Sequence, residues 1–295
     1  MIKCLKERLQ IEFEKQDRSG IYGFTQRYLA YNSNKIEGST LTEKQTANLF
    51  ETGTFVGEDG IFRAKDVEEM TGHFTLFNYM LQTYQQPLNE ELIKEYHYKL
   101  KAGVFEDLSN GYPVGEYKNR KNIVSDIETV LPQDVPDKMN QLLHDYENSA
   151  ETLEDIMRFH AAFEKIHPFQ DGNGRVGRML IFKECLRKNI MPLIIESDRK
   201  AEYYHFINEA QHEGRYEKLC KFAEEEQEEY QKQVKEFLEI LKKGIKSPGR
   251  PCIRLNLDDQ TLQLLYQNGE SIASLPRKSH CSESTIRRHL GLNTM

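Results

Sequence analysis

The residues best suited to carry out a reaction lie together at positions 167–178, in the stretch HPFQDGNGRVGR. His167 can accept a proton near neutral pH, because an unperturbed imidazole has a pKa of roughly 6.5. Asp171 offers the hard oxygen ligands that Mg²⁺ prefers. Arg175 and Arg178 are three residues apart, so on a helix they share a face and can bind phosphate oxygens through paired donors. This combination predicts phosphoryl chemistry on a nucleotide.

A turn made of Gly172, Asn173 and Gly174 separates the carboxylate from the arginines. Glycine has no Cβ and asparagine tolerates left-handed geometry, so several N–H groups can point at one anion. The N-terminus of a helix also favours negative charge. Such turns, helix-end histidines and arginine pairs are mostly structural when they occur singly. The turn, the histidine and the arginine pair together predict a phosphate-binding site.

Two helices must position this stretch. Apolar residues recur at intervals of three and four over 153–166 and again over 176–186, the period of an amphipathic helix. Pro168 ends the first helix, because its ring disfavours helical geometry in the preceding residue. We therefore expect His167 at a helix end and the glycine turn at the start of the next helix. Phe169 is interpreted as an apolar pin that holds the loop on the core.

This stretch resembles the signature of the Fic family, HPFx(D/E)GNGRxxR, and matches it at every specified position. Fic proteins mostly transfer AMP from ATP to a Ser, Thr or Tyr hydroxyl of a target protein. The resemblance therefore implies a protein adenylyltransferase with ATP as substrate and Mg²⁺ as cofactor. It assigns the general base to His167, the metal ligand to Asp171, the anion cradle to Gly172, Asn173 and Gly174, and the β- and γ-phosphate clamps to Arg175 and Arg178.

A second match lies far upstream, over residues 33–38. Ser33-Asn34-Lys35-Ile36-Glu37-Gly38 resembles the inhibitory pattern (S/T)xxxE(G/N) of the family. Ser33 and Glu37 are four residues apart and share a helical face, and Gly38 suits a left-handed helix end. In the family this glutamate pairs with the second arginine of the signature. The resemblance implies that Glu37 pairs with Arg178, occupies the γ-phosphate clamp and inhibits the enzyme.

Two further regions complete the expected site. Residues 117–131 mix apolar and polar residues between Gly115 and Pro132, which is consistent with a short hairpin. In Fic proteins a flap at this place aligns the target by main-chain pairing, and we assign its edge to Lys121, Asn122 and Ile123. An ordinary connecting hairpin is the alternative. Fic proteins also place a tyrosine beside the adenine, for which Tyr203 or Tyr204 is expected, although aromatics at helical spacing are usually core residues.

The sequence is expected to form four parts. These are an N-terminal helical region over 1–60, a Fic catalytic domain over 61–246, a linker over 247–254 and a helix-turn-helix-like domain over 255–295. The fold class is all-α, a Fic-type bundle with a short hairpin flap and a small C-terminal domain of the winged helix-turn-helix type. The linker is rich in proline and glycine.

The formal net charge of −7 is unevenly distributed. Residues 242–295 carry nine Lys and Arg against four Asp and Glu, whereas the rest of the chain is strongly acidic. Local positive charge suits a phosphate backbone, so DNA is one expected partner of residues 255–295, and another protein is the alternative. The five cysteines show no CxxC spacing and are expected to be free thiols.

Membrane partners are not expected. No apolar run approaches the roughly 20 residues of a membrane-spanning helix, and the start lacks the apolar core of a signal peptide, so the expected location is the cytoplasm. The target protein stays open, and automodification and a homodimer are further expectations. Two other functions compete with AMP transfer. One is hydrolysis of AMP from a modified protein at the same site, and the other is a nucleotide-sensing, DNA-binding regulator.

Overall fold

The computed structural model describes residues 1–54, 63–124 and 127–242, together with residues 267 and 290. The chain divides into two compact units, Met1–Ile245 and Lys246–Met295. Except for residues 267 and 290, the predicted linker and helix-turn-helix-like domain lie outside the described residues. The domain boundaries, the DNA or protein partner and the homodimer therefore stay predictions. Within the described part, no helix is both long and apolar enough to cross a membrane.

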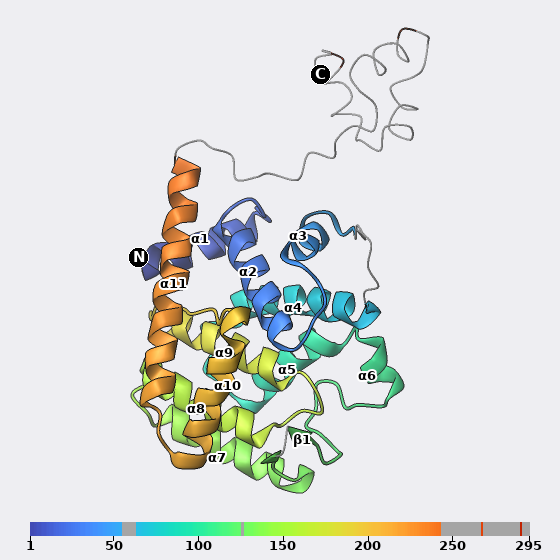
Figure 1. Ribbon diagram of the computed structural model, residues 1–295, viewed down its shortest axis with the longest axis vertical. Coiled ribbons are helices and arrows are strands. Elements are labelled where there is room, and N and C mark those ends of the chain that lie inside the picture. Colours follow the sequence, from blue (N-terminus) through green and yellow to red (C-terminus); the bar gives the residue numbers. More distant parts are fainter. Residues whose placement is uncertain (55–62, 125–126, 243–266, 268–289, 291–295) are drawn as a thin grey trace. The chain divides into compact units, whose positions relative to one another are not determined.

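The first unit is built almost entirely of α-helices (Figure 1), which confirms the predicted all-α class. In chain order the helices are α1 (Ile2–Glu14), α2 (Ile21–Ile36), α3 (Glu43–Thr52), α4 (Ala64–Thr83), α5 (Glu90–Lys101), α6 (Phe105–Ser109), α7 (Val135–Glu147), α8 (Leu153–Ile166), α9 (Asn173–Arg187), α10 (Lys200–Glu213) and α11 (Glu217–Lys242). Short 3₁₀ helices, η1 (Pro132–Asp134) and η2 (Ser197–Arg199), precede α7 and α10.

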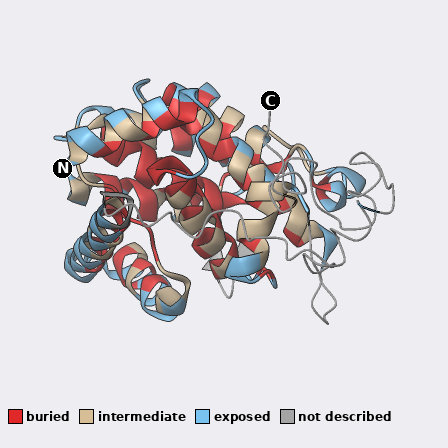
Figure 2. Cartoon of the chain, turned by 90° about the horizontal axis from the view of Figure 1, so that it is seen from above, coloured by how far each residue is buried: buried red, intermediate tan, exposed pale blue. Residues whose placement is uncertain are grey.

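Helix α9 lies at the centre of the bundle. Nearly every residue from Asn173 to Leu186 is buried, and α2, α4, α5 and α8 all pack against it. Figure 2 shows that buried residues gather inside the helical bundle and exposed residues on its outside. A helix that is buried on all sides must be apolar on all sides or have paired charges. Helix α9 has both apolar residues and a paired charge. Phe182 and Leu186 are core residues, and the buried Lys183 ammonium lies 2.6 Å from the Glu184 carboxylate. The bundle therefore places the N-terminus of α9 against its neighbouring helices.

The two helices of the signature (residues 167–178) have the boundaries that the sequence predicts. Helix α8 begins with a capping box between Thr152 and Asp155, and it ends at Ile166 with His167 as a left-handed cap. Gly172 then adopts φ 82° and caps the N-terminus of α9. A glycine is suited to this position because it has no Cβ to strain.

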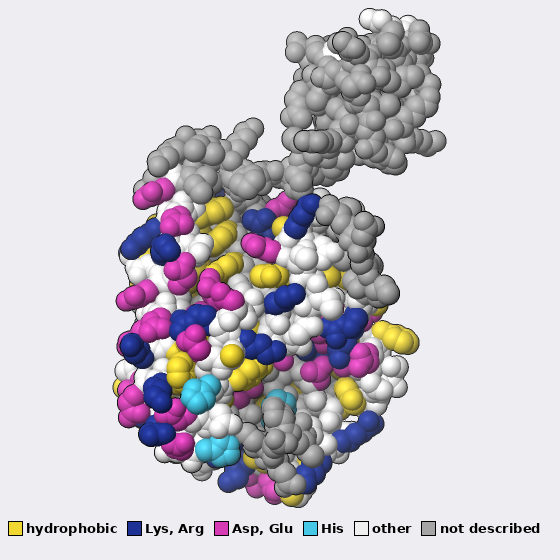
Figure 3. Space-filling view, in the orientation of Figure 1, with side chains coloured by type: hydrophobic (Ala, Val, Ile, Leu, Met, Phe, Trp, Pro, Cys, Tyr) yellow, Lys and Arg dark blue, Asp and Glu magenta, His cyan; other side chains and the backbone are white. Residues whose placement is uncertain are grey.

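The predicted hairpin is present and very short. Strand β1 (Ile123–Val124) pairs with strand β2 (Ile127–Glu128) in an antiparallel register, with Ile123 opposite Glu128 and Val124 opposite Ile127. On the outside of the bundle, acidic side chains with lysines among them gather along α11 (Figure 3), as expected of the solvated face of an amphipathic helix.

Candidate active site

His167 lies at the end of α8 in a strained backbone conformation. Its φ is 53° and its ψ 62°, and its amide donates a hydrogen bond to the Phe163 carbonyl at 2.9 Å. The ring is partly buried, and its Nδ1 atom has no hydrogen-bond partner. Burial and the nearby positive charge of Lys118 lower the pKa of His167 to about 4. The imidazole is therefore neutral at pH 7 and able to accept a proton.

The loop after His167 is held by Phe169 and Asn173. Phe169 is completely buried, which confirms its interpretation as an apolar pin. The Asn173 side chain accepts a hydrogen bond from the Phe169 amide at 2.8 Å and donates one to the Phe169 carbonyl at 2.9 Å. Because the oxygen and one N–H of this side chain are used inside the loop, the backbone N–H of Asn173 is its main candidate donor to an anion.

His97 of α5 supports the same loop and was not predicted from the sequence. Its ring stacks on Phe169 with the centroids 4.0 Å apart and an interplanar angle of 1°. Its Nδ1 accepts a hydrogen bond from the Gly115 amide at 2.9 Å, so its Nε2 carries the proton and donates to the Asp171 carbonyl at 3.0 Å. Burial lowers the pKa of His97 to about 3, and the ring stays neutral. The only signal in the sequence was a histidine beside Tyr96 in an apolar helical stripe.

The Asp171 carboxylate lies among cations. Its Oδ2 is 2.8 Å from the Nζ of buried Lys101 and 3.5 Å from that of Lys65, and its Oδ1 accepts the Gly172 amide at 2.7 Å. Burial opposes ionisation, but the charges of Arg175 and Lys101 outweigh it and hold the pKa of Asp171 far below its usual range. Neither lysine was predicted from the sequence.

The donor set around Asp171 limits the kind of metal site that can form. Among the described residues, no group of three or more His, Cys, Asp or Glu side chains could hold a metal ion by itself. The Asp171 side chain is 35% exposed, and one accessible carboxylate is what a Mg²⁺ ion needs when phosphates provide further ligands. The residues therefore fit a cation that arrives with a nucleotide.

The two signature arginines are buried and have different partners. Arg175 Nη1 lies 2.5 Å from the Glu69 carboxylate of α4, a residue that the sequence did not single out. Arg178 forms the predicted ion pair with Glu37, with Nη2 2.6 Å from Oε1. Its Nε donates to the Ser33 hydroxyl and its Nη2 to the Ser33 carbonyl, both at 2.9 Å. The structure thus brings together Ser33, Glu37 and Arg178 from distant parts of the chain.

Glu37 also covers the N-terminus of α9. It follows the last residue of α2, and Gly38 ends that helix with φ 86°. A Cβ added at Gly174 would overlap the Glu37 carboxylate, so this carboxylate occupies the space directly against the glycine turn. Burial opposes its ionisation, but Arg178 and Arg175 lower the pKa of Glu37 below its usual value. An ionised carboxylate thus lies where the sequence predicts an anion.

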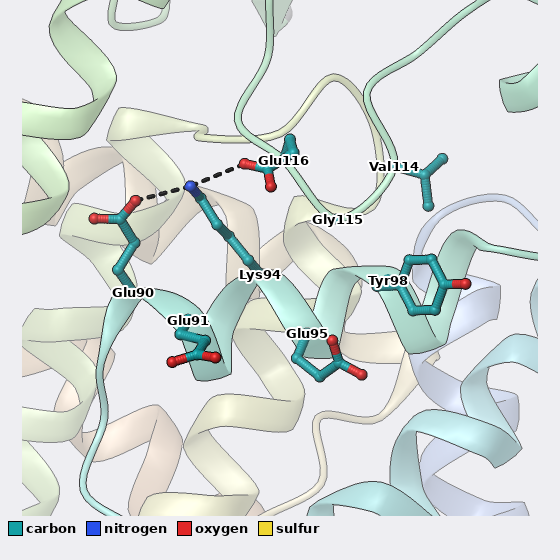
Figure 4. A pocket seen from close by; sticks show the side chains of 8 residues that line it. All are labelled: Glu90, Glu91, Lys94, Glu95, Tyr98, Val114, Gly115 and Glu116. Atoms are coloured by element: carbon teal, nitrogen blue, oxygen red, sulfur yellow. Dashed lines mark ion pairs between the residues drawn. The ribbon is translucent and has the colours of Figure 1, made fainter.

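A cavity of about 410 Å³ opens beside these groups. It is lined by Glu37, Arg63, Ala64, Lys65, Asp66, Glu69, Glu106, Asp171 and Arg175. Its lining combines acceptors with cations, as a site for a phosphate chain and its counterion requires. A second cavity of about 520 Å³ lies on the outer face of α5 (Figure 4) and is lined mainly by glutamates around Lys94, Tyr98 and Gly115. The residues of the signature do not line that second cavity.

One residue of the predicted hairpin edge contacts the signature loop. The Asn122 side chain donates to the Phe169 carbonyl at 3.1 Å, so it is bound to the signature loop, whereas Lys121 is exposed and Ile123 begins β1.

Tyr203 has no exposed surface, and its hydroxyl lies 2.7 Å from His160 Nε2. Tyr204 as a whole residue is 40% exposed. Of the two predicted adenine neighbours, only Tyr204 offers an accessible face.

These features define a class of protein: a helical bundle with an anion site at the N-terminus of its central helix and a neutral histidine beside it. Residues 87–185 match the model of the Fic/DOC family. The chain therefore carries a Fic/DOC domain, as the resemblance of its signature implied.

Two relatives of known name match a larger part of the chain. It is 29% identical over 188 residues to the protein adenylyltransferase Fic of Nematostella vectensis, which covers 62% of this chain and 42% of that protein. It is 30% identical over 183 residues to the protein adenylyltransferase Fic of Drosophila grimshawi, covering 60% and 36%. The chain thus spans less than half the length of these relatives.

Solved structures share the fold. A Fic-domain-containing signaling protein from Bacteroides thetaiotaomicron aligns with a TM-score of 0.59 and 22% identity over 99% of this chain and 96% of that one. A fragment of Fic-1 from C. elegans aligns with a TM-score of 0.63 and 20% identity over 83% and 72%. At these identities the likeness establishes the helical fold.

Proposed function

We propose that this protein is a protein adenylyltransferase, which transfers AMP from ATP to a Ser, Thr or Tyr hydroxyl of a target protein or of itself. The observation that carries the proposal is the neutral His167 ring in the same twelve residues as the glycine turn at the α9 N-terminus and two buried arginines. The names of the two sequence relatives support the same activity.

The chemistry follows from the positions of these groups. The target hydroxyl would lose its proton to His167 while its oxygen attacks the α-phosphorus, and the bond to pyrophosphate would break. Arg175 and Arg178 would bind the β- and γ-phosphates, with the N–H groups at the start of α9. Asp171 would hold Mg²⁺, which neutralises phosphate charge when bound. Tyr204 would contact the adenine, and Lys121, Asn122 and Ile123 would present the target.

The same geometry supports an inhibited resting state. Glu37 holds Arg178 and occupies the space against Gly174, so a γ-phosphate and the Glu37 carboxylate compete for one guanidinium. Two anions at one cradle repel each other. ATP would then bind without its γ-phosphate in place, and the α-phosphorus would be misaligned for attack.

Intact-mass spectrometry after incubation with ATP and Mg²⁺ tests the proposal. We expect few adducts on the wild type and abundant AMP adducts on Glu37→Gly, because that change frees Arg178. Adding His167→Ala to Glu37→Gly should remove the adducts. Glu14→Gln, an exposed glutamate in α1, is the matched control and should behave as the wild type.

Each outcome bears on a separate assignment. Adducts on the double variant equal to those on Glu37→Gly would exclude His167 as the base. A Glu37→Gly variant no more active than the wild type would exclude inhibition by Glu37. A chain that makes no adduct, but removes AMP from a protein modified beforehand, would be a hydrolase instead.

A further inference from the structure

Lys118 is a buried cation without a matching charge among its hydrogen-bond partners. It is 2% exposed and lies just before the hairpin. Its ammonium donates to the Asn122 side chain and the Thr129 hydroxyl, both at 2.7 Å, and to the Ile166 carbonyl at 3.4 Å. All three acceptors are uncharged. Burial of an ammonium without a carboxylate is unfavourable, and it lowers the pKa of Lys118 to about 8.

The contacts of Lys118 lie on both sides of His167. Its backbone N–H donates to the Pro168 carbonyl at 2.8 Å, and its ammonium donates to the Ile166 carbonyl. Lys118 therefore binds the carbonyl groups of the two residues that flank the proposed catalytic histidine. His167 is a non-glycine residue at φ 53°, a conformation that persists only where its surroundings hold it. Lys118 provides part of that support.

The same ammonium also organises the base of the hairpin. Thr129 donates from its hydroxyl to the Asn122 carbonyl at 3.0 Å, and Asn122 donates from its side chain to the Phe169 carbonyl at 3.1 Å. Thr129 and Asn122, the two hairpin partners of Lys118, thus contact each other, and Asn122 also contacts the signature loop. A displacement of the hairpin base would act on the loop through these bonds.

We propose that Lys118 is a positioning residue that couples the hairpin to His167, holding the backbone of the histidine and its ring in the geometry needed for proton transfer. The inference rests on the proposed role of His167 as the base. A target segment that pairs with the hairpin would stiffen the frame around the base. Lys118 makes this connection from outside the signature.

The charge of Lys118 supports this assignment. Besides burial, the groups that act most strongly on the pKa of His167 are Lys118 from the segment before the hairpin, the Glu164 carbonyl of α8, Glu37 from the end of α2 and Asp171 from the signature loop. Of these, Lys118 is the only cation, and it acts with burial to keep the imidazole unprotonated. Its removal should raise the pKa of His167, whereas loss of a purely structural contact would not.

The test compares Lys118→Met with Lys118→Arg, both in the active Glu37→Gly background. NMR titration of the His167 ring needs no activity, and we expect its pKa to rise by about half a unit or more in Lys118→Met. AMP-transfer assays should show kcat lower by roughly 10- to 100-fold with the KM for ATP changed less than about threefold. Lys118→Arg keeps the charge and should recover much of both. Lys138→Met, an exposed lysine of α7, is the control.

Further variants keep the result interpretable. Circular dichroism and thermal unfolding establish that Lys118→Met is folded. If it is not, Thr129→Val removes one acceptor and retains the charge, and it should lower kcat about threefold or more while leaving the pKa of His167 unchanged. If the Lys118→Met variant is folded and keeps the parental kcat and the parental pKa of His167, the proposal is wrong. If Lys118→Met does not fold, a Thr129→Val variant with the parental kcat would overturn the proposal instead. If His167 proves not to be the base, the titration still reports whether Lys118 acts on its ring.

Discussion

The two ends of the signature are held in different ways. At the loop end, Phe169 and Asp171 are fixed through their backbone groups by Asn173, Asn122 and His97. At the helix end, the Arg178 guanidinium is held by Ser33 and Glu37 of a distant helix. The difference indicates that the loop carrying His167, the proposed base, is held by contacts within the protein, whereas Arg178 is held by a carboxylate that another anion can replace.

The physical reason lies in charge and exposure. The loop contacts join neutral groups that are buried or partly buried. Arg178 is 3% exposed and needs an anion as a partner, because an unpaired buried charge is costly. The Glu37 side chain is 30% exposed and can be replaced at Arg178 by another anion. A nucleotide phosphate is an anion of the right kind.

The largest effect is expected at the loop end, where a substitution tests whether buried hydrogen bonds hold the loop in place. His97→Leu leaves the Gly115 amide and the Asp171 carbonyl without their partner, so we expect the free energy of unfolding to fall by about 2–4 kcal/mol. AMP transfer in the Glu37→Gly background should fall roughly 100-fold, because the loop between the base and Asp171 loses its support. Urea denaturation and an adduct assay measure the two effects.

His97→Gln is the matched variant for this experiment. Its amide keeps one donor and one acceptor, so part of both losses should be recovered. If His97→Leu proved as stable and as active as its parent, the view of a loop fixed by buried hydrogen bonds would be wrong.

A smaller effect is expected at the helix end. Ser33→Ala removes the acceptor of Arg178 Nε but leaves the Glu37 ion pair and the Ser33 carbonyl contact. We expect AMP transfer to rise about two- to fivefold, corresponding to less than about 1 kcal/mol of the inhibitory contact. The increase should stay well below that of Glu37→Gly. Ser109→Ala, an exposed serine of α6, serves as control, and a Ser33→Ala variant at or below wild-type activity would contradict the assignment.

The smallest effect is expected from pH. Because the pKa of Glu37 is lowered from its usual value, the ion pair is fully formed above about pH 4.5 and is lost only as the pH falls through the lower value in the folded protein. The ratio of Glu37→Gly to wild-type activity should therefore stay within about twofold between pH 6 and pH 8. Adduct formation measured across that range tests this. A steep change in the ratio would indicate that a different titrating group controls Arg178.

Local parts of the site could be predicted because helical period and turn chemistry are short-range properties. The spacing of apolar residues located α8 and α9, and Pro168 and Gly172 marked where one ends and the other begins. The mixed segment around residue 123 indicated the hairpin. The Glu37–Arg178 contact was anticipated through the family resemblance, since the two residues are 141 positions apart and no spacing rule connects them.

The sequence by itself determined the chemical inventory: a histidine, a carboxylate, a glycine turn and two arginines in an order that puts them on one loop and one helix. Only the tertiary structure decided their partners. Glu69, Lys101, His97 and Lys118 reach the signature because α4, α5 and the hairpin segment pack against it. Tyr203 was likewise placed in the core and Tyr204 at the surface by packing. Which side chains neutralise a buried charge depends on distances between elements far apart in the chain, and these are set by the packing of the whole bundle.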